Sequence, residues 1–258
     1  MTSRLSAITW NTFREAVRDR VLYNLVLFVL LLVASAPLFS QISIGLEKLM
    51  LVNVGLSSIS LFGVIIAIFV GIGLVSKEIE KKTLYTILSR PVRRWEFIVG
   101  KYLGLLLTLV VNTALMTVGF YLALLIFING LKRADAMLLV AVYFIVLQFM
   151  MMVAITLLFS TFSTPIFSAI FAFALYVIGT FGEDLKNFAA MSHGATKWLA
   201  MGASYIMPNF ASLNVIAQAA HEQNVGSGLI FSNTVYALLY SLAVTVAAVM
   251  IFERRNLK

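Results

Sequence analysis

Six long apolar stretches run along the chain, separated by more polar segments. An α-helix needs about 20 apolar residues to cross the roughly 30 Å hydrocarbon core of a bilayer. The stretches reach or approach this length without Lys, Arg, Asp or Glu, and they cover residues 21–40, 52–75, 102–128, 137–159, 166–181 and 229–252. The pattern predicts an all-α membrane protein with six transmembrane helices, forming a single transmembrane domain over residues 1–258.

Residues 1–20, before the first stretch, have the spacing of an amphipathic helix. One side of a helical wheel carries Leu5, Ile8, Thr12, Phe13 and Ala16, and the other carries Asn11, Arg14, Glu15 and Arg18. Such a helix is typical of an element that lies along a membrane surface. We expect an interfacial helix in the cytoplasmic leaflet; the alternative is a solvated N-terminal tail.

The charges of the loops predict the orientation. With both termini inside, the cytoplasmic segments hold 14 of the 19 Lys and Arg residues, and the opposite loops hold five. Lys and Arg collect on the cytoplasmic side of membrane proteins, which favours an N-in/C-in topology. The net charge of +8 is then explained by membrane orientation, so we expect membrane lipid and no nucleic acid among the partners.

The segment 77–101, between the second and third stretches, is the most polar part of the chain. Leu84, Ile87 and Leu88 have the spacing of an apolar stripe on a short helix, and Pro91 ends that helix. A charged helix–bend–helix of this kind can dock another protein, with the stripe for burial and the charges for register. The alternative is a basic loop that binds anionic lipid.

The segment 182–228, before the last stretch, is too long for a structureless connection and too apolar for a solvated one. We predict two short amphipathic helices, interrupted at Gly194 and Pro208, on or in the outer leaflet. His193 and His221 lie here without Cys or carboxylates at metal-ligand spacing, so no metal site is expected.

Several kinds of chemistry are missing from the sequence. It has no G-x-x-x-x-G-K-[ST] phosphate loop and no hydrolase or metalloprotease motif, so we expect no enzyme activity from this chain. Uncharged spans argue against an ion-coupled carrier. Energy for transport would then come from a partner. Four amide side chains lie within the predicted spans, and we expect them to form hydrogen bonds between helices. They are Asn24, Asn53, Asn112 and Gln148.

Two motifs resemble those of ABC-2 type transporter permeases. The first, KEIEKKTLYTILSRPVRRWEFIVGKYLG over 77–104, is similar to the family pattern at Glu78, Glu80, Thr83, Leu84, Leu88, Ser89, Pro91, Glu96, Phe97, Gly100 and Lys101. The second, YIMPNFASLN over 205–214, is similar to a stretch of the last external loop and includes Tyr205, Pro208, Asn209, Phe210 and Asn214. Arg93 stands where the family often has Ser or Thr, so the capping box with Glu96 is expected to be lost.

The resemblance implies an ATP-driven exporter in the plasma (inner) membrane of a prokaryote. Two ABC ATPase subunits would carry the ATP and Mg²⁺, and this chain would hold no cofactor. A second permease protomer, in a homodimer or from a homologue, would complete the pathway. The ATPase-coupling residues would be Glu78, Glu80, Thr83, Leu84, Ile87, Leu88, Pro91, Arg93, Arg94 and Glu96. Small residues expected at the dimer contact are Gly55, Gly71, Gly73, Ala169, Ala172 and Ala174. The competing hypothesis is a non-transporting scaffold or assembly subunit.

Overall fold

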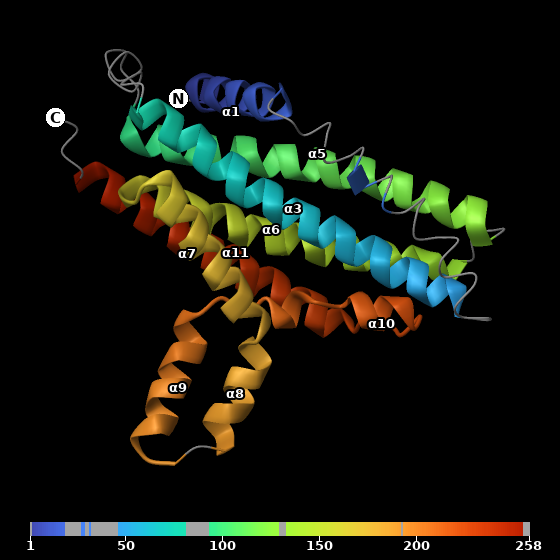
Figure 1. Ribbon diagram of the computed structural model, residues 1–258. Coiled ribbons are helices and arrows are strands. Elements are labelled where there is room, and N and C mark those ends of the chain that lie inside the picture. The colour runs from blue at the N-terminus through green and yellow to red at the C-terminus, as the bar shows by residue number, and fades with distance from the viewer. Residues whose placement is uncertain are drawn as a thin grey trace.

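The computed structural model describes residues 2–18, 27–28, 31, 46–80, 93–128, 133–191 and 193–254. In these ranges the chain folds into helices joined by short turns, and none of them contains a strand. The long helices form one elongated bundle, and a short helical hairpin, α8 and α9, projects from its side (Figure 1). The all-α prediction is confirmed for this part of the chain.

The helices follow the predicted apolar stretches closely. Their bounds are α1 Thr2–Arg18, α3 Glu47–Glu80, α5 Arg94–Ile128, η1 Arg133–Ala136, α6 Met137–Phe162, α7 Pro165–Thr180, α8 Gly182–Met191, α9 Ala195–Ile206, η2 Ala211–Leu213, α10 Ile216–Ala220 and α11 Ser227–Arg254. With 35 residues, α5 is about 50 Å long. It therefore extends well beyond the hydrocarbon thickness that it needs to cross.

Four of the described helices, α3, α5, α6 and α11, are long and apolar enough to cross a membrane. The bent pair of α7 and α8, with 64° between its halves, would make a fifth span. The predicted first span, 21–40, lies outside the described residues except at three positions. One of these, Phe28, is buried with its ring edge-on to Phe62 of α3, 6.5 Å between centroids. Six spans therefore remain a prediction.

The bundle has two ends that differ in what closes them. We call the end at which α3 and α11 finish and α5 begins the proximal end, and the opposite end the distal end. α1 lies along the first half of α5, and α11 finishes at the proximal end (Figure 1). The amino-terminal helix and the carboxyl-terminal helix thus share one half of the bundle, as the predicted topology requires; which side of a membrane this is remains a prediction.

Helix α6 is the centre of the bundle and contacts α3, α5, α7 and α11. Its middle is buried all round, with Phe149, Met151 and Met152 fully inaccessible. A helix that is apolar on every side needs neighbours on every side, which explains its place.

Glycines of α3 let the neighbouring helices approach closely. A Cβ at Gly55 would strike the Phe120 ring of α5, and a Cβ at Gly71 would lie 2.9 Å from Thr156 Cγ2 of α6. The surface of α3 at these two glycines is therefore already covered by α5 and α6 of the same chain. Their predicted use at a dimer contact is wrong, because the sequence could not distinguish close packing inside the chain from close packing between chains.

Helix α7 has one buried and one exposed side. Ser168 and Ala172 are fully buried, while Ala174 is exposed, and Gly73 of α3 has open space beside it within the described structure. The exposed side of α7 carries large apolar residues, namely Ile166, Phe167, Ile170, Phe171 and Phe173. Lipid or another protein must cover this side in a membrane.

Candidate functional site

The segment 77–101 is described only at its two ends. Glu78 and Glu80 lie in the last turn of α3, which continues four residues past Ser76 without a break. The predicted apolar stripe and its end, namely Thr83, Leu84, Ile87, Leu88 and Pro91, lie outside the described residues. Arg93, Arg94 and Glu96 stand at the beginning of α5.

The start of α5 is capped by Glu96. Its Oε2 accepts a hydrogen bond from the backbone N–H of Arg93 at 3.0 Å, and the side chain is only 2% exposed. This is one half of a capping box, in which the third helical residue reaches back to the cap residue. Arg93 has no hydroxyl for the other half, so the expected loss of the box is correct for one of its two hydrogen bonds.

Arg94 joins the start of α5 to the end of α11. Its Nη1 donates to the backbone oxygens of Phe252 at 3.3 Å and Glu253 at 2.9 Å. These carbonyls belong to the last turn of α11, where intrahelical donors are missing. Beside them the Phe97 and Phe252 rings stack, 5.7 Å between centroids. Sequence analysis missed this contact because more than 150 residues separate its partners.

Two glycines of α5 form the seat for α1. A Cβ at Gly100 would lie 2.5 Å from Ile8 Cγ2, and a Cβ at Gly104 would lie 2.6 Å from Thr12 Cβ and 2.7 Å from the Thr9 carbonyl oxygen. The predicted amphipathic helix is present, and its apolar side lies against α5. Its placement at a membrane surface stays a prediction.

A buried lysine lies next to this seat. Lys101 is 2% exposed, with Nζ 3.6 Å from Glu15 Oε2 of α1 and 5.7 Å from the centroid of the Phe97 ring. Burial of an ammonium group is costly unless a partner compensates the charge, and the carboxylate and the aromatic face do so here. The helical wheel placed Glu15 on the polar side of the helix, yet its carboxylate lies at the contact between α1 and α5.

In the distal half of the bundle, the Pro-Asn motif folds into an irregular segment, 207–215, whose one helical turn is η2 and which packs on α7 and α11. The backbone N–H of Asn209 donates to Tyr236 Oη at 2.9 Å, and that of Phe210 donates to the Gly179 carbonyl at 2.9 Å. Asn209 Oδ1 accepts from the Ser212 N–H at 3.2 Å. The segment is thus held by hydrogen bonds to its own backbone and to two helices, α7 and α11.

The close fit of this segment depends on small residues at the end of α7. A Cβ at Gly179 would lie 2.5 Å from both Pro208 O and Phe210 Cδ2. Asn214 Oδ1 accepts from the Ile216 N–H at 3.3 Å, where α10 begins. Tyr205 lies in α9, and its side chain is outside the described structure. Pro208, Asn209, Phe210 and Asn214 therefore act first as structural residues.

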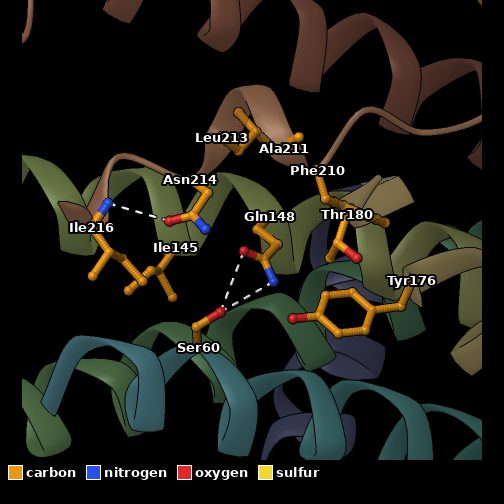
Figure 2. Close-up of a pocket in the computed structure, with 10 residues that line it drawn as sticks. All are labelled: Ser60, Ile145, Gln148, Tyr176, Thr180, Phe210, Ala211, Leu213, Asn214 and Ile216. Atoms are coloured by element: carbon orange, nitrogen blue, oxygen red, sulfur yellow. Dashed lines mark hydrogen bonds between the residues drawn. The ribbon is translucent and has the colours of Figure 1, made fainter. Parts of the chain in front are cut away.

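Beneath the segment is a cavity of about 60 Å³ (Figure 2). Its polar lining comes from four parts of the chain: Ser60 of α3, Gln148 of α6, Tyr176 and Thr180 of α7, and Asn214. Apolar side chains close the rest, namely Ile145, Phe210, Ala211, Leu213 and Ile216. The Gln148 Nε2 donates to Ser60 Oγ at 3.2 Å, and its Oε1 lies 3.4 Å from the same oxygen.

The distal rim is tied by an ion triad. Lys48 Nζ lies 2.6 Å from Asp135 Oδ1 and 2.8 Å from Glu222 Oε1. The three residues come from the first turn of α3, from η1 and from the turn after α10, so the triad joins three separate connections. The two histidines, His193 and His221, are exposed, and the described residues bring together no three His, Asp or Glu side chains able to hold a metal.

These features define a helical, multi-pass membrane protein. The family model for ABC-2 family transporter proteins matches residues 6–257. Because this match covers nearly the whole sequence, the chain belongs to the ABC-2 transporter family, the permease subunits of ABC transporters. No curated protein matches the sequence.

Proposed function

We propose that this chain is the permease of an ATP-driven exporter in the plasma membrane of a prokaryote. It works with two separate ABC ATPase subunits and a second permease protomer, as a homodimer with N-in/C-in topology and six spans. Membership of the family supports the ATPase partner, since ABC-2 permeases generally work with one. ATP and Mg²⁺ belong to that partner, and the chain itself is not an enzyme.

The observation that carries this proposal is the junction at the start of α5. Immediately after the segment 77–92, Glu96 caps the helix, Arg94 binds the end of α11, and Gly100 seats α1. A displacement of the preceding loop therefore moves α5, α11 and α1 together. Since α5 runs the length of the bundle, the displacement also reaches the distal end.

The docking surface itself is proposed to be the apolar stripe of Leu84, Ile87 and Leu88. Burying a large apolar side chain contributes about 1.5–3 kcal/mol, whereas an exposed ion pair contributes about 0–1 kcal/mol. The stripe should therefore supply most of the affinity for the ATPase. The charges of Glu78, Glu80 and Arg93 should set register and salt sensitivity instead.

The test is to substitute the stripe and then measure ATPase binding and substrate-stimulated hydrolysis. Leu84→Asp and Leu88→Asp should release the ATPase while the permease still inserts into the membrane. Arg93→Ala, a change of surface charge in the same segment, should retain binding. If the Asp variants keep full binding and stimulation, the segment is not the coupling element. ATP hydrolysis by the purified chain without a partner would separately refute the division of labour.

The direction of transport needs its own measurement. In inside-out vesicles that contain the complex, an exporter accumulates substrate in the lumen when ATP is added outside. Accumulation in right-side-out vesicles loaded with ATP would instead identify an importer. A complex that binds the ATPase tightly but moves no solute in either preparation would favour the scaffold.

A further inference from the structure

The cavity beneath the segment 207–215 contains a buried amide with unused hydrogen-bonding capacity. Gln148 is 6% exposed, and among the described residues Ser60 is its one hydrogen-bond partner. The two N–H groups of the amide point in different directions, so the single Ser60 oxygen can accept a hydrogen bond from only one of them. Ser60 therefore leaves at least one N–H of Gln148 without a protein acceptor within the described structure.

Two further polar groups point toward the same space. The Tyr176 hydroxyl points toward Gln148 and Ser60, and the Asn214 amide lies on the other side of Gln148 with its Oδ1 toward the Ile216 N–H (Figure 2). Within the described residues the Tyr176 hydroxyl makes no hydrogen bond, and Asn214 uses its Oδ1 for the Ile216 N–H but leaves its Nδ2 unused. Tyr176 is partly buried and Asn214 is exposed, so the cost falls on the buried Gln148. Leaving a buried amide N–H unpaired costs about 1–3 kcal/mol, which argues for a bound polar partner.

The lining determines the charge of that occupant. Its ten residues include amides and hydroxyls but no Lys, Arg, His, Asp or Glu. A bound ion would have no compensating charge in a site of low polarity, and this is costly. Amides and hydroxyls both donate and accept, so they fit a neutral group that can do the same. A hydroxyl group or a water molecule meets this condition.

Size and position agree with this chemistry. A cavity of about 60 Å³ exceeds the roughly 15 Å³ that is needed to hold one water molecule, so it has room for water or for the end of a small solute. Gln148 lies near the middle of α6, one of the membrane-crossing helices. Backbone outside α-helices is tolerated in a membrane protein where it is buried in protein or lines a polar cavity, and the segment 207–215 lines one.

We propose that this cavity is a binding site for neutral hydroxyl groups, with Gln148, Ser60, Tyr176 and Asn214 as its recognition groups. Ordered water and the hydroxyl end of an uncharged solute share the required chemistry. The site lies inside one protomer and is formed by α3, α6, α7 and the segment 207–215. It therefore stands independently of the proposed ATPase coupling and of dimer formation.

The first test is an experimental map of the full chain in lipid nanodiscs, at a resolution that shows ordered water elsewhere in the protein. We expect density within hydrogen-bond distance of Gln148 Nε2 and the Tyr176 hydroxyl. Compact separate peaks identify water, and elongated density that continues out of the cavity identifies a hydroxyl-bearing solute. An empty cavity, a bound ion, or an acyl chain in it would overturn the proposal.

The second test uses radiolytic hydroxyl-radical labelling in membranes, because radiolysis of bound water generates hydroxyl radicals next to buried side chains. Tyr176 should be modified readily in the native chain and severalfold more slowly in Gln148→Leu, which keeps the volume but removes the amide. The matched control is Asn53→Leu, because Asn53 donates to Leu49 of its own helix, at 3.0 Å. If Gln148→Leu does not fold, Ser60→Ala replaces it as the test variant. Unchanged Tyr176 labelling in the folded variants would contradict the site.

Discussion

The proximal and distal ends of the bundle are closed in different ways. At the proximal end, helices meet helices directly: Gly104 seats α1, Lys101 is buried beside Glu15, and Arg94 caps α11. In the distal half, the segment 207–215, whose one helical turn is η2, covers a polar cavity near the middle of the bundle and is held by neutral hydrogen bonds, while the ion triad of Lys48, Asp135 and Glu222 ties the rim. We expect the first arrangement to transmit displacement as a rigid unit and the second to leave space into which a neighbour can move.

The proximal junction and the segment 207–215 also differ in how far they can move without unfolding. Packed helices have few alternative arrangements, because interiors are close-packed and do not deform continuously. A short irregular segment above a cavity can exchange its hydrogen bonds for hydrogen bonds to water or to a hydroxyl group. We therefore expect the proximal junction to move as one body and the distal segment to rearrange. The α8–α9 hairpin leaves the bundle directly beside that segment (Figure 1).

The largest effect is expected at the distal rim, from Lys48→Met. The Asp135 side chain is 5% exposed, so the loss of Lys48 removes a cation 2.6 Å from a nearly buried carboxylate. Breaking a fully buried pair costs about 3–5 kcal/mol, and partial exposure of Lys48 reduces this to roughly 2 kcal/mol. Thermal unfolding in detergent should show it. Lys197→Met, a change at an exposed site on α9, should leave the midpoint in place; equal midpoints for both variants would mean that the rim is not closed by this triad.

The next effect tests the seat of α1. Gly104→Ala places a Cβ against both the Thr9 backbone oxygen and Thr12, so the helix must shift, at a cost of about 1–3 kcal/mol. Amide hydrogen exchange over α1 should accelerate. Gly202→Ala in α9 is the control, since nothing described lies within 4 Å of its added Cβ. Unchanged exchange in Gly104→Ala would mean that α1 is not fixed to α5.

The apolar pattern predicted the central helices better than it predicted their ends. The stretches 137–159 and 229–252 correspond to α6 Met137–Phe162 and α11 Ser227–Arg254 within three residues. The stretch 102–128, however, belongs to a helix that begins at Arg94. The pattern excluded Glu96 and Lys101 as too polar, but their partners compensate them when they are buried.

The hydrophobic pattern could not predict contacts between segments that lie far apart in the sequence. Of the four amides expected to bond between helices, Gln148 does so with Ser60, while Asn53 donates to Leu49 of its own helix and Asn112 donates to Met116 Sδ of its own helix. Asn24 lies outside the described residues. The Pro-Asn motif was identified from the sequence, but its fit against Gly179 depends on a turn of the chain that no local spacing encodes.

An intermediate effect separates hydrogen bonding from packing at the distal segment. Tyr236→Phe removes the acceptor of the Asn209 N–H and leaves the ring, so the loss should be about 1–2 kcal/mol. Hydrogen exchange at Asn209 should rise more than exchange in α5. Tyr143→Phe, at an exposed tyrosine whose hydroxyl contacts Thr234, should change neither. If exchange at Asn209 stays slow in Tyr236→Phe, packing alone holds the segment and the two ends resemble each other more closely than we propose.

The smallest effect on stability distinguishes two adjacent arginines at the proximal junction. Arg94 donates to the Phe252 and Glu253 carbonyls, whereas Arg93 is exposed and contributes its backbone N–H to Glu96, which an alanine retains. Arg94→Ala should therefore cost about 1 kcal/mol, because its site is partly open to solvent, and Arg93→Ala should cost close to nothing. Hydrogen exchange in the last turn of α11 should increase in Arg94→Ala alone. In the assembled complex, Arg94→Ala should still bind the ATPase, because the proposed docking surface is unchanged. It should weaken the stimulation of ATP hydrolysis by substrate, because the hydrogen bonds that join α5 to α11 are lost. If both variants behave alike in exchange and in stimulation, α11 does not move with the start of α5, and displacement passes along α5 without it.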